Sequence, residues 1–387
     1  MKIALLTTDN RWLYRQHDQV TPSFGMAPEA LISGLAALPE IEIHIVSCTR
    51  HPLKSPEQLG PKIFFHSLYV PKIGWLRMGY LACIRAVRRR LRVIQPDIVH
   101  GHGTEFESAI CAAHSGFPNV ITLLGIMREM AKVLKARPGS FYWLAALLED
   151  HCLRRTAGVL CNSRFTQEKV RHRTPQTWVV PNAVREVFFD TPTTPPTATK
   201  ATPPTPILLN IGSVSAYKRQ NELLDVAERL HASGLKFELK FIGLATPGNP
   251  YADRFLARLP RLPFVSHHDF LPATELIAQY DHASALLHVS AIESFGLVVA
   301  EALCRNLKFI GFSSGGVADI LAGVESAEVL ADGDWEGLHT ALDRWLQPGA
   351  PRPRATIEVM RQRYHPSVIA QRHLEIYREV LNRIGAK

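Results

Sequence analysis

The sequence predicts an α/β protein built from two Rossmann-like domains that face one another across a cleft. Short apolar segments alternate with helical patterns through the first half of the chain, and this alternation is typical of a parallel, doubly wound sheet. The alternation stops at a proline-rich stretch and starts again at residue 207. A length of 387 residues also favours two domains of ordinary size over a single one.

In the first half, six apolar segments have the length and composition of buried strands. They lie at 2–7, 41–47, 97–102, 119–124, 158–162 and 177–181. Helical patterns separate them, near 28–38, 76–94, 104–115, 139–155 and 163–172. A helix that joins two strands returns the chain to the same end of the sheet, so these strands are expected to pair in parallel. Residues 1–189 are therefore predicted to form the first domain.

The stretch 190–206 is rich in proline and threonine and interrupts every periodicity. It contains six prolines, which fix φ and lack the N–H that helices and sheets require. We predict a linker there and a second domain at 207–366. Its expected strands lie at 207–212, 236–242, 264–265, 285–289 and 308–312, and its expected helices near 219–233, 250–259, 273–282, 296–305, 315–322 and 334–346. A separate amphipathic helix is expected in the last segment, 367–387.

Composition excludes several protein classes. No apolar run approaches the ~20 residues that a membrane-spanning helix needs. The first apolar run ends at Leu6, too early for a signal peptide, and reads as a buried strand. The six cysteines are scattered without a CxxC pair, which favours reduced thiols in a cytoplasmic protein over a disulfide framework or a zinc site.

The most informative motif is the stretch ESFGLVVAE, in which Glu293 and Glu301 stand eight residues apart. If a helix begins near Gly296, these eight residues span at most ~12 Å. The helix N-terminus would attract a diphosphate, and Gly296 would let the backbone approach it closely. The two carboxylates could then accept hydrogen bonds from hydroxyls of a sugar and of a ribose. The alternative is a loop glutamate followed by an amphipathic helix with a solvated glutamate.

This motif and the sequences around it resemble glycosyltransferase family 4, whose members are retaining enzymes of the GT-B fold. The other similar stretches follow the family's order and spacing along essentially the whole chain: FGMAPEALISGLAAL, PDIVHGH, GVLCNSRFT, VVPNAV, NIGSVSAYKRQNELL and SSGGVADIL. The resemblance implies a nucleotide-sugar site in the second domain and an acceptor site in the first. It also implies that the helix at 367–387 packs back toward the first domain.

Carried onto this chain, the resemblance places Glu293 against hydroxyls of the transferred sugar and Glu301 against the ribose. Four consecutive backbone N–H groups would hold the diphosphate, those of Ser294, Phe295, Gly296 and Leu297. Lys218, six residues after Gly212, would neutralise the phosphate charge that develops as the glycosidic bond breaks. The alternative for Lys218 is an ordinary solvated surface lysine.

Two further donor contacts are expected from loops. Gly25 stands before Pro28, a favourable first helical residue, and its loop is expected to face the same phosphates across the cleft. After Gly212 the family commonly has arginine, whereas this chain has Ser213. Arg219 is therefore expected to substitute for the missing arginine as a phosphate ligand.

The first domain departs from the family at Leu124. The family often has His-Gly after this strand, and the histidine contacts the donor sugar, whereas this chain has Leu124 followed by Gly125. His100 and His102 lie two residues apart and thus on one face of the neighbouring strand, from which they could supply the contact. We therefore add His102 to the catalytic set and assign His100, Gly125 and Arg128 to the acceptor site. The alternative is that both histidines are polar ends of a buried strand.

The function that the sequence favours is retaining transfer of a hexose from a nucleotide diphosphate sugar to a hydroxyl acceptor, in cell-envelope polysaccharide or glycolipid synthesis. No cofactor or metal is expected, since no cluster of metal-ligating residues is evident in the sequence. A nucleotide-sugar 2-epimerase fits less well, because no set of acid/base carboxylates is identified in the first domain. A degenerate homologue that binds nucleotide sugar without turnover is the third interpretation. A nicotinamide dehydrogenase is disfavoured, because no G-x-G-x-x-G turn follows the first strand.

The positive charge is confined to the first half of the chain. Residues 1–190 contain 24 Lys and Arg against 15 Asp and Glu, whereas residues 191–387 contain 20 of each, so all of the net +9 lies in the first half. On a helix over 75–94, Leu76, Leu81, Ile84, Val87 and Leu91 would face the core. Four arginines of a dense cluster that also contains Arg90 would project outward together: Arg85, Arg88, Arg89 and Arg92.

This charge predicts an anionic partner. The cytoplasmic face of a membrane that bears a lipid-linked acceptor fits best, with the protein peripheral to it. Nucleic acid is not expected, because no recognition motif accompanies the basic residues. The alternatives are a soluble acidic acceptor and an ordinary solvated helix face.

Overall fold

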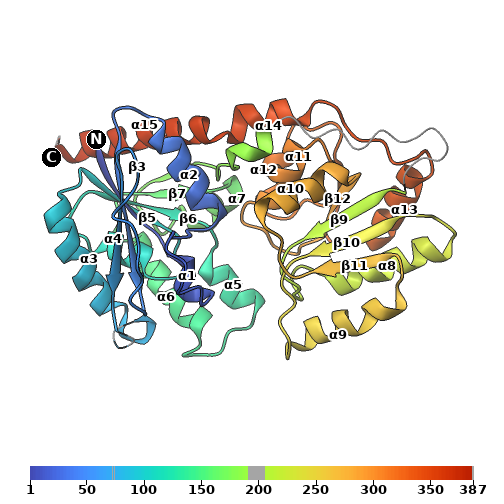
Figure 1. Cartoon of the computed structure of the whole chain (residues 1–387), viewed down its shortest axis with the longest axis horizontal. Helices are drawn as coiled ribbons and strands as arrows, with labels where there is room; N and C mark the ends of the chain where they lie inside the picture. The colour runs from blue at the N-terminus through green and yellow to red at the C-terminus, as the bar shows by residue number, and fades with distance from the viewer. Residues whose placement is uncertain (72, 74, 191–204, 386–387) are drawn as a thin grey trace. The chain divides into compact units, whose positions relative to one another are not determined.

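The structure is a computed structural model that describes residues 1–387 except 72, 74, 191–204 and 386–387 (Figure 1). The chain forms two compact units. Unit 1 consists of Met1–Arg185 and Tyr364–Lys387, and unit 2 of Glu186–Arg363. The predicted linker at 190–206 lies almost entirely outside the described residues.

The sheet of unit 1 has eight strands in the order β3-β4-β2-β1-β5-β6-β7-β8. Every neighbouring pair is parallel except β3 and β4. The strands are β1 Lys2–Leu6, β2 Glu42–Thr49, β3 Gln58–Gly60, β4 Ile63–Tyr69, β5 Ile98–His102, β6 Asn119–Leu123, β7 Val159–Cys161 and β8 Thr177–Val179. The chain first builds outward from β1 to β2 and β4 and then returns to β5 on the other side. The strand order therefore reverses between β1 and β5.

Helices cover both faces of this sheet: α1 Asn10–Leu13, α2 Met26–Ala36, α3 Leu81–Ile94, α4 Ser108–Ala113, α5 Met127–Val133, α6 Phe141–Leu153, α7 Arg164–Val170 and α15 Pro366–Gly385, with a 3₁₀ turn η1 at Leu76–Met78. Successive side chains of β1 point to opposite faces, as in any strand. Ile3 and Leu5 pack in the core that α2 and α15 cover, whereas Ala4 and Leu6 pack in the core that α3 and α4 cover. Both faces are apolar for this reason.

Unit 2 contains a six-stranded parallel sheet in the order β11-β10-β9-β12-β13-β14. The strands are β9 Ile207–Ile211, β10 Glu238–Ile242, β11 Val265–His268, β12 Ala285–His288, β13 Lys308–Phe312 and β14 Glu328–Leu330. The helices are α8 Gln220–Ala232, α9 Pro250–Arg258, α10 Ala273–His282, α11 Leu297–Cys304, α12 Val317–Leu321, α13 Trp335–Leu346 and α14 Thr356–Tyr364, with 3₁₀ turns η2 Glu186–Phe189 and η3 Leu259–Arg261. This is the strand order of a Rossmann fold, with its reversal between β9 and β12.

Two doubly wound parallel sheets confirm the predicted fold class. The C-terminal helix is confirmed as part of unit 1: its Ile369, Leu374 and Tyr377 are buried in the same core as Leu31 and Leu35 of α2. Each predicted strand and helix corresponds to an element of the structure. Among the strands and α-helices of the described residues, six were not predicted: β3, β4, β14, α1, α5 and α14.

One helix prediction is wrong in its first turns. The segment 75–94 is not a single helix, because Tyr80 adopts a left-handed conformation (φ 58°) that separates η1 from α3. Leu81, predicted to face the core, is 48 % exposed as a result. Within α3 itself the prediction is confirmed, since Ile84, Val87 and Leu91 are buried. The four arginines expected on the outside are exposed: Arg85, Arg88, Arg89 and Arg92.

Candidate active site

In unit 2 the predicted donor residues gather where the strand order reverses. Gly212 directly follows β9, and the loop that carries Glu293 follows β12. In doubly wound sheets, ligands bind outside the carboxyl ends of the strands at this reversal. The two loops are joined by a hydrogen bond from the Ala291 N–H to the Tyr217 carbonyl at 2.8 Å. The sequence therefore places the donor candidates at the position that this fold uses for ligands.

Lys218 and Glu293 form an ion pair in this position. The distance between Lys218 Nζ and Glu293 Oε2 is 2.5 Å, and both side chains are largely shielded from solvent. The lysine stem runs over Gly212, where a Cβ would lie 3.6 Å from Lys218 Cε. A cation and a carboxylate are thus held side by side at the edge of the sheet. One can meet a phosphate and the other a sugar hydroxyl.

Glu293 is held in its ionised form. Burial alone would raise its pKa, but His288 and the Lys218 charge act in the opposite direction and lower the pKa to about 2. His288 Nε2 lies 3.8 Å from Glu293 Oε2, which is longer than a hydrogen bond, and it attracts the carboxylate when the ring is protonated. His288 is the last residue of β12 and is almost completely buried. The sequence assigned no role to it, although it stands five residues before Glu293.

Helix α11 begins where the motif predicts. Gly296 is its N-cap, with φ 97°, a conformation that favours glycine. The Gly316 N–H donates to the Glu293 carbonyl at 2.9 Å, and a Cβ on Gly296 would lie 2.8 Å from Val317 Cγ2. The start of α12 therefore packs directly on the loop 293–296. A side chain at Gly296 would require both a strained backbone and a shift of α12.

Glu301 lies deeper than its predicted role suggests. Its side chain is fully buried, and the Tyr280 hydroxyl donates to Glu301 Oε2 at 3.2 Å. Contact with a ribose requires that this carboxylate become accessible, so the ribose contact stays a prediction. Tyr280, on α10, is a partner of Glu301 that the sequence did not indicate.

Arg219 was predicted to bind phosphate in place of the arginine that the family has at position 213. In the structure its side chain contacts Asp332. Arg219 Nη1 donates to Asp332 Oδ1 at 2.6 Å, and its backbone has φ 60° at the N-cap of α8. Ser213 is exposed on the same loop. A phosphate role for Arg219 requires exchange of Asp332 for the ligand, and this role stays a prediction.

In unit 1, His100 is placed in the core. One ring nitrogen is 2.7 Å from the Tyr377 hydroxyl and the other is 2.7 Å from Thr122 Oγ1, so both are engaged within the fold. Burial, with the neighbouring histidines His102 and His373, holds the pKa of His100 well below its usual range. His100 therefore matches the alternative interpretation, a polar residue of a buried strand, and we do not retain it in the acceptor site.

His102 lies on the same face as His100, as predicted, with ring centroids 5.5 Å apart. It is buried, and burial together with His373 lowers its pKa to about 3, so the ring is neutral at physiological pH. It lines a small cavity with Ala27 and Leu31 of α2, the helix that Gly25 begins with φ 84°. The structure thus brings His102 close to the helix that follows the Gly25 loop. Its contact with substrate stays a prediction.

Gly125 and Arg128 lie at the carboxyl end of β6. Arg128 is half exposed and donates to Asp150 Oδ2 at 2.9 Å. Gly125 is covered by a carboxylate that the sequence did not single out, since a Cβ there would lie 3.2 Å from Glu105 Oε1. Three glutamates with raised pKa values lie near the carboxyl ends of β5 and β6: Glu105, Glu107 and Glu149. The signal for two of them was present in the stretch GTEFES, where acidic residues directly follow a central strand.

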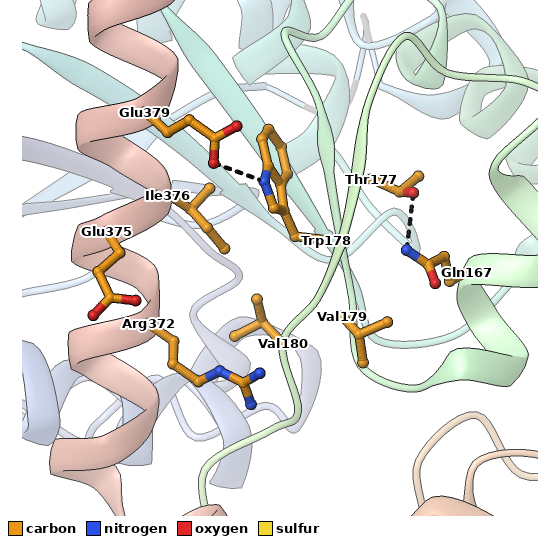
Figure 2. Close-up of a pocket in the computed structure, with 9 residues that line it drawn as sticks. All are labelled: Gln167, Thr177, Trp178, Val179, Val180, Arg372, Glu375, Ile376 and Glu379. Carbon is orange, nitrogen blue, oxygen red and sulfur yellow. Dashed lines mark hydrogen bonds between the residues drawn. The ribbon is translucent and has the colours of Figure 1, made fainter.

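A pocket of about 400 Å³ opens elsewhere on unit 1, between β8 and α15 (Figure 2). Trp178 Nε1 donates to Glu379 Oε2 and Gln167 Nε2 to Thr177 Oγ1, both at 3.1 Å. Arg372 lines this pocket too, but none of the predicted site residues does. The pocket is therefore distinct from the candidate active site.

Two family models match the chain, one on each half. Residues 29–186 match Glycosyltransferase Family 4, and residues 197–363 match the model described as glycosyl transferases group 1. Together they leave only the two ends and a short central segment unmatched. The chain belongs to glycosyltransferase family 4.

Solved structures confirm the GT-B fold of this family 4 glycosyltransferase. A sucrose-phosphate synthase from Thermosynechococcus elongatus has a TM-score of 0.76 at 16 % identity, with 99 % of each chain covered. HepE of Anabaena in complex with UDP-glucose has a TM-score of 0.68 at 15 % identity, covering 98 % of this chain and 100 % of HepE. AviGT4, a glycosyltransferase of avilamycin A biosynthesis, has a TM-score of 0.64 at 21 % identity, covering 99 % of this chain and 98 % of AviGT4. No curated protein sequence matches the chain.

None of the described helices is both long and apolar enough to cross a membrane. Across all the described residues, no group of three or more His, Cys, Asp or Glu side chains is arranged to hold a metal ion.

Proposed function

We propose that this glycosyltransferase is a retaining enzyme that moves a hexose from a nucleotide diphosphate sugar to a hydroxyl acceptor in cell-envelope polysaccharide or glycolipid synthesis. The observation that carries the proposal is the Lys218–Glu293 pair at the strand-order reversal of unit 2. The structures of HepE with UDP and with UDP-glucose support a nucleotide-sugar donor for a chain of the same fold.

In the proposed reaction the leaving nucleoside diphosphate needs positive charge, and Lys218 supplies it. The N-terminus of α11 adds its backbone N–H groups and the positive end of its dipole. Glu293, ionised above a pH of about 2, accepts hydrogen bonds from hydroxyls of the hexose. Retention needs no protein nucleophile, because the acceptor oxygen can attack the face from which the diphosphate departs. The protein contributes orientation and charge stabilisation.

The sequence left two alternatives to an active glycosyltransferase. A 2-epimerase is not retained, because both halves of the chain match glycosyltransferase models. A homologue that binds nucleotide sugar without turnover is disfavoured by the intact Lys218–Glu293 pair and by the glycine at 296.

We expect the purified protein to release nucleoside diphosphate from one member of a panel of UDP-, GDP- and ADP-sugars, with a cell-envelope extract as acceptor. Release should continue in EDTA, since Lys218 and α11 supply the charge that a metal would otherwise provide. A thermal-shift panel of UDP, GDP and ADP identifies the base first. If EDTA abolished the activity and manganese restored it, the proposal that transfer needs no divalent metal ion would be contradicted. Binding without release from any donor would favour the inactive homologue.

We also propose that unit 1 meets an anionic membrane through α3. Four exposed arginines lie on this helix, and no ion pair involves them within the described part of the chain: Arg85, Arg88, Arg89 and Arg92. Each cation near an anionic surface contributes roughly 1 kcal/mol, and salt screens the attraction beyond a Debye length. Binding should therefore be weak and reversible.

We expect co-sedimentation with vesicles that contain phosphatidylglycerol at low salt and its loss at high salt. The triple variant Arg85→Gln, Arg88→Gln, Arg89→Gln should lose most of the binding. Arg171→Gln, at the exposed C-cap residue of α7, serves as the control and should bind like the wild type. Equal binding to neutral and anionic vesicles, or binding to neither, would contradict the proposal.

A further inference from the structure

We propose that Glu105 binds the acceptor, accepting a hydrogen bond from a hydroxyl of an acceptor sugar at the carboxyl edge of the unit 1 sheet. This inference rests on the proposed function, which requires an acceptor site, and it names a residue and a ligand class for that site.

Glu105 follows a central strand of the unit 1 sheet. It lies three residues past the end of β5, beside the loop that follows β6. The strand order of unit 1 reverses between β1 and β5, and ligands bind outside the strands' carboxyl ends at such a reversal. Glu105 thus occupies in unit 1 the topological position that Glu293, in the loop after β12, occupies in unit 2.

A pair of glycines forms a cradle for its carboxylate. A Cβ on Gly103 would lie 2.6 Å from Glu105 Oε2, and a Cβ on Gly125 would lie 3.2 Å from Glu105 Oε1. Gly103 also has φ 92°, a conformation that favours glycine. Both glycines end central strands, so two loops leave room for one carboxylate. An ordinary solvated glutamate would need neither of them.

Hydrogen bonds fix the two loops that contain Gly103 and Gly125. Glu149 is buried, and its Oε2 accepts from Thr104 Oγ1 at 2.9 Å and from the Met127 N–H at 2.8 Å. Asn162 Nδ2 donates to the Leu124 carbonyl at 3.0 Å. The residues that flank Glu105 and Gly125 are therefore fixed, and Glu149 is a positioning residue. A rigid frame of this kind lowers the entropic cost of orienting a bound hydroxyl.

Among the three glutamates at this edge, only Glu105 is partly exposed, whereas Glu107 and Glu149 are buried. Burial raises the pKa of Glu105, and the backbone N–H groups of Glu105, Gly125 and Thr104 oppose the rise. Within the described residues, no ion pair involves Glu105. A carboxylate without a cationic partner repels phosphate, and of its roughly four lone-pair sites the three backbone N–H groups leave about one for a hydroxyl donor. Its chemistry suits the neutral hydroxyls of a sugar rather than a diphosphate.

The test compares transfer with hydrolysis in the Glu105→Gln variant. Nucleoside diphosphate release is measured from the preferred donor alone and with two acceptor sources, a panel of methyl hexosides and a detergent-solubilised cell-envelope extract. A hydrogen bond to a charged group is worth about 10- to 100-fold in binding. We expect the ratio of transfer to hydrolysis to fall by that factor, with a raised KM for the acceptor.

Gly125→Ala provides a second variant, because its methyl group would press on the carboxylate without removing it. It should raise the KM for the acceptor in the same way. Glu168→Gln, an exposed glutamate on α7, is the matched control and should behave like the wild type. Thermal unfolding of each variant establishes that the fold is intact.

Three outcomes would overturn the inference, and they are distinguishable. Wild-type transfer kinetics in Glu105→Gln would remove Glu105 from the acceptor site and leave the proposed function standing. Donor hydrolysis that no acceptor stimulates in the wild type would contradict the acceptor site and transfer together, and would leave only donor cleavage standing. No release from any donor would overturn the proposed function itself, and the acceptor site with it.

Discussion

Replacing Lys218 with alanine is expected to lower donor turnover by roughly 10²–10³-fold, because it removes the cation that we propose stabilises the leaving diphosphate. The same change leaves Glu293 beside His288 without its 2.5 Å partner. The loss should appear in kcat, since the phosphate charge that Lys218 stabilises develops only as the glycosidic bond breaks. Single-turnover release of nucleoside diphosphate separates this step from donor binding.

Glu293→Gln should produce a loss of similar size for a different reason. A carboxylate accepts from two sugar hydroxyls, whereas an amide offers one acceptor and two donors. Because the pKa of Glu293 is depressed to about 2, the carboxylate stays ionised at every pH above about 3. The activity of the wild type should therefore show no decline that follows Glu293 between pH 8 and pH 5. A steep loss near pH 5 that disappears in Glu293→Gln would contradict this electrostatic account.

Glu301→Gln serves as the comparison within the same motif. We expect it to weaken nucleotide binding more than it lowers kcat, because its proposed partner is a ribose far from the breaking bond. Equal kcat losses in Lys218→Ala, Glu293→Gln and Glu301→Gln would indicate that all three merely maintain the fold of the loop 293–296. Thermal unfolding of the variants tests that interpretation.

The sequence predicted the parallel sheets and the start of helix α11 well, because both depend on residues that are close together in the chain. Buried strands read as apolar segments, and Gly296 with the residues around it marks a helix start through backbone conformation alone. Lys218 and Glu293 were each predicted from separate loops. Their ion pair then follows from topology, since β9 and β12 are neighbours in the sheet.

The side-chain partners of the candidate site residues could not be predicted, because they depend on tertiary contacts that the periodicity of the sequence does not reveal. His100 is engaged by Tyr377, which lies 277 residues later in the chain. Arg219 donates to Asp332, which lies 113 residues later in the chain. The position of the Glu105 carboxylate between Gly103 and Gly125 becomes visible only in the folded structure. The helix break at Tyr80 likewise rests on a left-handed backbone that a non-glycine residue seldom adopts.

Unit 2 contains a buried ion pair whose loss should have the largest effect on stability. Arg305 and Asp281 are each 2 % exposed, and Arg305 donates to both carboxylate oxygens of Asp281 at 2.6 Å. Arg305 Nη1 also donates to the Asp190 carbonyl at 2.6 Å. Because Arg305 is the C-cap of α11, this network anchors the helix whose N-terminus is proposed to meet the diphosphate.

Arg305→Ala is expected to destabilise unit 2 by about 3–5 kcal/mol, because it removes the guanidinium that donates to both oxygens of the buried Asp281 carboxylate. Urea unfolding measures the loss, and hydrogen exchange should localise it to Glu186–Arg363. Arg229→Ala, which breaks the exposed pair with Glu336, is the matched control and should leave the unfolding midpoint unchanged. The double variant Arg305→Met, Asp281→Leu should recover much of the loss, since it removes both charges together. If Arg305→Ala were as stable as the wild type, Asp281 would have to be neutralised or hydrated at little cost, and the pair could not be what anchors α11.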